Sequence, residues 1–212
     1  MSQIPFYFAV LVGIFPILSL KFKKKEISSD TYFIEPFLWL IILSDLYELI
    51  VTRQLKFSSE LWFRSYLLLE FSTLFYFFRK LLKGNYKAFL ISYGILYLMA
   101  FITSLFFWNE WDKLKTDSFL SVLEIIFVYC SSILWFKDIF MELQEKSLLS
   151  VSVFYFLSGF ILYFSGTIFL FLVSDQIKKH NLGFEAYWNL NIFFNIVLRF
   201  LLIIGIWKGC KK

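Results

Sequence analysis

Seven stretches of roughly 20 mostly apolar residues follow one another along this chain of 212 residues, and short polar segments connect them. A helix rises about 1.5 Å per residue, so each stretch is long enough to cross the hydrocarbon layer of a membrane. The pattern predicts an all-α fold, a polytopic bundle of seven transmembrane helices. Six helices is the competing count, because the first stretch is the shortest. The predicted helices cover residues 4–20, 33–51, 61–82, 88–108, 118–136, 148–174 and 185–207.

Composition excludes the other broad classes of protein. Apolar residues make up 59% of the chain and charged residues only 17%. A chain this short cannot bury so much apolar surface in a soluble core, and disorder requires the opposite composition. No connection is long enough for a separate soluble domain, so we expect residues 1–212 to form a single integral membrane domain. The first stretch lacks a basic leader and a cleavage site, which favours a retained helix over a signal peptide.

The distribution of lysine and arginine predicts the orientation. With the N-terminus outside, 13 of the 21 Lys and Arg residues fall on the inner side and six on the outer side. Cytoplasmic loops carry the excess of basic residues in membrane proteins. We therefore expect the N-terminus outside and the C-terminus in the cytoplasm. The basic cluster at 21–25 is interpreted as a topology anchor at anionic headgroups, and no direct binding of nucleic acid is expected.

Five ionisable residues of the second, third and fifth predicted helices fall in the outer half of the bilayer. They are Asp45, Glu48, Arg64, Glu70 and Glu124. Counting the helical rise places Asp45 and Glu124 about 9 Å, and Glu70 about 14 Å, below the outer boundary. Charged groups at such depths are costly and usually serve a function. The pattern predicts one outward-facing pocket that binds a ligand or a proton.

A second polar feature lies on the last predicted helix. Asn191, Asn195 and Arg199 recur every four residues and therefore share one face. Lipid cannot satisfy amide or guanidinium donors, so this stripe should face the interior of the bundle. Arg199 needs an acceptor, and Glu70 is the deepest candidate.

Both polar features also have a purely structural interpretation. Asp45 or Glu48 with Arg64, and Glu70 with Arg199, would form ion pairs that fix how the helices pack. The asparagines would then make hydrogen bonds between helices. In the sixth predicted helix, Gly159 and Gly166 favour close packing of helices.

Metal and cofactor chemistry has few candidate residues. One histidine, His180, and two distant cysteines, Cys130 and Cys210, cannot supply the clustered ligands of a zinc site, and a disulfide between the two is not expected. The chain contains no H-E-x-x-H, G-x-S-x-G or Walker-type motif. We therefore expect no metal, no cofactor and no catalytic residues.

Five short segments in a fixed order carry a family resemblance. They are SDLYE at 44–48, LWF at 61–63, LLEF at 68–71, YFFR at 76–79 and WNLNI at 188–192. The chain resembles a large group of small polytopic membrane proteins that is common in Bacteroidota, has no established activity and is in part encoded near sensor kinases and response regulators. It is also similar in size and build to membrane accessory proteins of bacterial defence loci, including those beside RNA-targeting CRISPR nucleases. The resemblance implies a multi-pass protein of the bacterial inner membrane.

Three functions are compatible with these features. The first is a non-enzymatic sensor or accessory protein that uses the outward pocket and acts through a membrane or cytoplasmic protein partner. The second is an oligomeric pore or effector that serves a CRISPR-type defence locus, in which the stripe on the last helix lines a path. The third is a membrane-embedded enzyme that acts on lipid through a carboxyl group, although no nucleophile is identified.

Overall fold

A computed structural model describes residues 4–23, 27–82, 84–107, 113–141, 147–179 and 184–210. Within these ranges the chain is helical, with an isolated β-bridge between Ile27 and Cys210 and no strand, so the all-α prediction is confirmed. The elements are α1 (Ile4–Phe22), α2 (Ser29–Tyr32), α3 (Glu35–Tyr47), η1 (Glu48–Gln54), α4 (Glu60–Leu81), α5 (Lys87–Phe106), α6 (Lys113–Met141), η2 (Leu148–Ser150), α7 (Ser152–Lys179) and α8 (Phe184–Lys208).

Each of the seven predicted stretches coincides with a long helix, and the second is α3 continued by the π-helix η1. Four helices are long and apolar enough to cross a membrane, and they supply the segments Pro5–Phe22, Lys87–Phe106, Lys115–Met141 and Asn189–Lys208. Among the described side chains, α7 has a shorter apolar segment, Ser152–Ile168. Charged residues such as Arg64 and Glu70 interrupt the apolar sequence of α4, which explains why it falls short of that composition.

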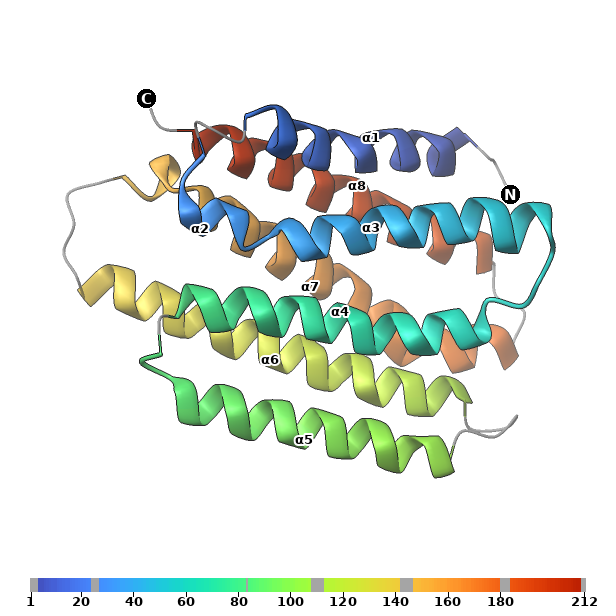
Figure 1. The fold of residues 1–212 in the computed structure, drawn as a ribbon. Helices are drawn as coiled ribbons and strands as arrows, with labels where there is room; N and C mark the ends of the chain where they lie inside the picture. Colours follow the sequence, from blue (N-terminus) through green and yellow to red (C-terminus); the bar gives the residue numbers. More distant parts are fainter. Residues whose placement is uncertain are drawn as a thin grey trace.

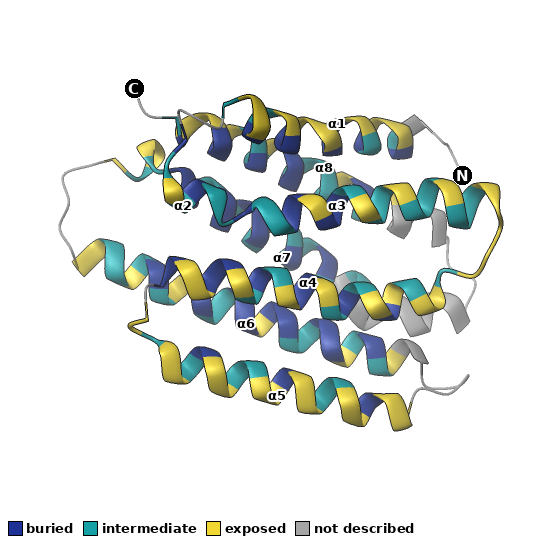
Figure 2. Cartoon of the chain, in the orientation of Figure 1, coloured by how far each residue is buried: buried dark blue, intermediate teal, exposed yellow. Residues whose placement is uncertain are grey.

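Six helices form a closed ring, and α5 lies outside it. Helix α1 packs against α3 and α8, α8 against α7, α7 against α6, α6 against α4, and α4 against α3. Helix α5 packs on α4 and α6 at the edge of the bundle (Figure 1). Most of its surface is exposed and apolar, including Ile95, Leu98 and Ile102 (Figure 2). Such a surface is suited to contact with lipid.

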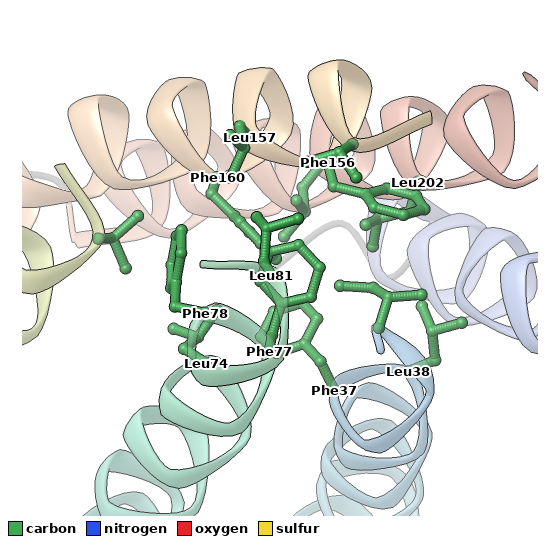
Figure 3. Close-up of a cluster of buried hydrophobic side chains, with 14 of the residues drawn as sticks. Phe37, Leu38, Leu74, Phe77, Phe78, Leu81, Phe156, Leu157, Phe160 and Leu202 are labelled. Carbon is green, nitrogen blue, oxygen red and sulfur yellow. The ribbon is translucent and has the colours of Figure 1, made fainter. Parts of the chain in front are cut away.

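Aromatic and aliphatic side chains fill one half of the ring. Phe37 of α3, Phe77 of α4 and Phe160 of α7 meet with ring centroids 5.1–5.7 Å apart in edge-to-face contacts (Figure 3). Phe156 and Leu202 extend this core to α8. The core takes up the second half of α4, where the sequence is rich in phenylalanine, and it leaves the first half of that helix to the polar site.

The prediction of close packing at the glycines of α7 is confirmed. A side chain on Gly159 would approach Leu198 of α8 to 3.0 Å, and one on Gly166 would overlap the ring of Phe194. Because glycine has no side chain, α7 and α8 can approach each other closely at these two positions, as helices do at small residues in membrane proteins.

Candidate functional site

A cavity of about 230 Å³ occupies the half of the ring that the hydrophobic core leaves open. Residues of α1, α3, η1, α4, α6, α7 and α8 line it, whereas no described residue of α5 does. Its polar and charged lining consists of Ser44, Asp45, Glu48, Ser59, Trp62, Tyr66, Glu70, Ser121, Glu124, Tyr163, Asn191, Asn195 and Arg199. The apolar residues between them come from the same helices.

The structure brings most of the predicted site residues to this one cavity. Asp45, Glu48, Glu70 and Glu124 all line it, from four different elements. The stripe Asn191, Asn195 and Arg199 faces the same space from α8. Arg64 is the exception and lies in a separate site.

Arg199 pairs with Asp45 and not with Glu70. Its Nη2 donates to Oδ1 of Asp45 at 2.7 Å, and its Nη1 donates to the backbone carbonyl of Ala9 in α1. A Cβ on Gly13 would stand 2.6 Å from Oδ2 of Asp45 and 2.7 Å from Nη1 of Arg199. The glycine therefore gives the ion pair room to reach the backbone of α1. Sequence reasoning missed Ala9 and Gly13, because nothing in an apolar helix marks a backbone acceptor.

Arg64 pairs with Asp117 of α6 and donates to the hydroxyl of Ser104 in α5, so the predicted pairing with Asp45 or Glu48 is wrong. Its guanidinium carbon also lies 5.1 Å from the ring centroid of Phe101. Arg64 and Glu70 are six positions apart on α4, which puts them about 120° apart around the helix. One therefore faces α5 and α6 while the other faces the cavity.

Asp117 escaped the sequence prediction for a simple reason. Helix α6 begins at Lys113, five residues before the predicted start at 118, so the carboxyl was assigned to a polar connection. Only 6% of Asp117 is exposed. Asp117 was expected in a loop, but it lies one turn inside α6, where it is buried and pairs with Arg64.

Glu70 and Glu124 form the deepest acidic part of the cavity. They are 4% and 1% exposed, and the two carboxyl groups are close enough to interact electrostatically. Tyr66 donates its hydroxyl to Oε1 of Glu70 at 3.1 Å, whereas Oε1 of Glu124 has no hydrogen-bond partner. In the described part of the chain neither carboxyl pairs with a lysine or an arginine. A buried carboxylate without a cation is costly, so this pair favours a proton or a positively charged guest.

The cavity end farthest from the core, which we call the mouth, is built around the π-helix η1. A π-helix closes its turns between residues five apart. Glu48 and Arg53 accordingly face each other, with Nε and Oε1 3.5 Å apart, and the guanidinium of Arg53 lies 3.6 Å from the ring centroid of Phe6. On the other side Tyr47 stacks on Trp62 with ring centroids 4.3 Å apart.

The described residues contain no group of three or more His, Cys, Asp or Glu side chains arranged to hold a metal ion. Cys130 and Cys210 are both free thiols, and His180 lies outside the described residues. The cavity therefore offers carboxyl, phenol, amide and guanidinium groups to a guest.

Comparisons with models of protein families, with curated proteins and with solved structures found no match to this chain.

Proposed function

We propose that the protein is a multi-pass protein of the bacterial inner membrane with seven spanning helices, the N-terminus outside and the cavity facing outward. Four helices of sufficient length and apolarity, together with the apolar exposed surface of α5, support the membrane location. The excess of basic residues on the side opposite the cavity supports the orientation. The resemblance to membrane proteins of Bacteroidota points the same way.

We infer that the protein is a non-enzymatic sensor or accessory protein. The observation that carries this proposal is the acidic cavity, which lies in one half of the ring beside a closely packed apolar half. A guest or proton bound at Glu70 and Glu124 has no open route through that apolar half. The bound guest or proton must therefore act on the inner side by changing how the helices pack. In thermodynamic terms, binding shifts the equilibrium between two conformations of the bundle.

The output is proposed to reach a protein partner. The connections on the inner side are short, and the first two of them are basic, so a membrane or cytoplasmic partner would contact them together with the ends of the helices. The resemblance suggests a signalling neighbourhood or a CRISPR-type defence locus as the setting.

Affinity purification of the full chain in mild detergent, with mass spectrometry and native mass measurement on one sample, tests this function. We expect a partner at a fixed ratio whose retention changes at least about threefold in the double variant Glu70→Gln/Glu124→Gln. Glu60→Gln is the control, because Glu60 is exposed at the start of α4, on the outer side, and does not line the cavity. Unchanged retention in the double variant would contradict a sensing role for the cavity.

Two other outcomes would replace the proposal. A homo-oligomer without a partner, which conducts ions in liposomes and loses conduction on Arg199→Leu, would establish the pore. A mass change in lipid extract incubated with the protein would establish the lipid-acting enzyme. No contact in the cavity favours either function over the sensor.

A further inference from the structure

The geometry points to a small organic cation as the guest of the cavity, a monoamine whose ammonium group sits between Glu70 and Glu124 and whose carbon skeleton lies against aromatic side chains. This inference rests on the proposed function, since it names the ligand class of the same cavity. Three independent observations carry it: the balance of charge, a row of side chains on α4, and the size of the space.

The lining has two more acidic groups than basic groups once the ion pairs are counted. Arg199 neutralises Asp45, and Arg53 neutralises Glu48. Glu70 and Glu124 remain, both almost completely buried and without a cationic partner among the described residues. Oε1 of Glu124 is an open acceptor. An ammonium group would supply donors to it and would balance the charge of a carboxyl group that is ionised beside it.

Helix α4 presents a row that leads from the mouth to the acids. Trp62, Tyr66 and Glu70 are spaced four residues apart and therefore lie along one face. The rings of Trp62 and Tyr66 have centroids 6.4 Å apart and are tilted by 49°. Aromatic faces attract cations, most strongly when water is excluded. The row thus offers a monoamine favourable contacts along its whole way to Glu70.

The rest of the wall distinguishes an organic cation from a bare inorganic ion. Phe6, Leu67, Ile125, Phe164 and Ile192 line the same space with carbon. Metal cations such as Ca²⁺ take six to eight oxygen ligands, whereas this lining alternates carboxyl groups with apolar surface. A cavity of about 230 Å³ is large enough for a monoamine of the size of phenethylamine.

Equilibrium binding to the full-length protein in lipid nanodiscs tests the inference. The probe is tritium-labelled phenethylammonium at neutral pH. We expect saturable binding that unlabelled phenethylammonium competes away, and that the neutral analogue 2-phenylethanol and equal concentrations of NaCl do not. Glu70→Gln and Glu124→Gln should each weaken binding by roughly tenfold or more, the usual effect of losing one charge-assisted hydrogen bond. Glu35→Gln should bind as the unaltered chain does, because Glu35 pairs with Lys21 on α1, away from the cavity.

The inference is overturned if folded, unaltered protein shows no saturable binding, if 2-phenylethanol competes as well as the amine, or if NaCl does. Should a glutamine variant fail to fold, the comparison of charged and neutral probes on the unaltered chain still decides the matter. The proposed sensor function is tested by a different result, the retention of the partner. A cavity that ignores amines while Glu70→Gln/Glu124→Gln still alters partner retention remains a sensor with another guest.

Discussion

Two buried arginines show how the same residue serves different purposes in one bundle. Arg64 and Arg199 are 4% and 5% exposed, and each pairs with an aspartate on another helix. Arg64 contacts Asp117, Ser104 and the ring of Phe101, and it does not line the cavity. Arg199 forms part of the cavity wall.

The difference between the two sites lies in what surrounds each pair. Oδ2 of Asp45 has no hydrogen-bond partner, and the space beside the pair of Asp45 and Arg199 can admit water or a guest. A charge pair in a closed site fixes helix positions, whereas a pair beside a cavity can exchange partners. Burial alone therefore does not separate a structural arginine from a functional one, and the neighbouring space does.

The largest expected loss of stability comes from removing the aspartate of the Arg64 pair, and removing the aspartate of the Arg199 pair gives the comparison. Asp117→Ala should lower the free energy of unfolding by about 3–5 kcal/mol, because it removes the aspartate that pairs with the buried Arg64 guanidinium. Asp45→Ala should cost less, about 1–3 kcal/mol, because water in the cavity can solvate Arg199. Unfolding in mixed detergent micelles measures both. Equal losses would show that the Arg199 pair is as structural as the Arg64 pair.

Gly13→Ala sharpens the same comparison from the side of α1. The added methyl group would lie 2.6 Å from Oδ2 of Asp45, so the ion pair must move away from the helix. Overpacking of this kind costs about 1–3 kcal/mol. The same micelle titration measures it. Gly94→Ala in α5 is the matched control, since both substitutions gain the same helix propensity of about 1 kcal/mol, and the methyl group on residue 94 meets only the movable ring of Phe75 at 3.0 Å. A loss for Gly13→Ala no greater than that of Gly94→Ala would argue against a close fit at Arg199.

The length of the apolar stretches was sufficient to predict the helices, and depth along them was sufficient to group the acids. Each helix must hold its hydrogen bonds within itself in a membrane, so length and apolarity alone define it. Asp45, Glu70 and Glu124 fell at similar depths in the sequence, and they line one cavity in the structure.

The pairing of charges could not be predicted, because it depends on rotation about each helix axis and on which helices are neighbours. Depth made Glu70 the natural partner of Arg199, yet α8 packs on α1, and α1 packs on α3, which brings Asp45 to it. Gly13 and the carbonyl of Ala9 complete that site and carry no signal in the sequence. The row of Trp62 and Tyr66 beside Glu70 has a four-residue spacing, but aromatic residues are so frequent in this chain that the spacing alone does not mark a site.

At the mouth, the pair between Glu48 and Arg53 should matter little for stability. Both side chains are about a quarter exposed, at 28% and 23%, and exposed pairs contribute about 0–1 kcal/mol. Glu48→Gln should therefore lower the free energy of unfolding by less than about 1 kcal/mol, far less than Asp117→Ala. The same micelle titration, repeated at low and high salt, measures it. A loss comparable to that of Asp117→Ala would mean that the mouth is part of the structural frame.

The smallest effect is expected at a third polar contact, which lies at the end of the bundle away from the cavity. The hydroxyl of Tyr86, which precedes α5, donates to Oδ1 of Asp138 in α6 at 2.6 Å. This hydrogen bond raises the pKa of Tyr86 above its usual value of about 10. Because the folded-state pKa is the higher one, the stabilisation is fully present below pH 10 or so and is lost as the pH rises through the folded-state value. Tyr86→Phe should lower the melting temperature slightly at pH 7 and should abolish the extra loss that the unaltered chain shows in strongly alkaline buffer. Thermal unfolding of both proteins at the two pH values measures this, and an alkaline loss that persists in Tyr86→Phe would assign it to another tyrosine.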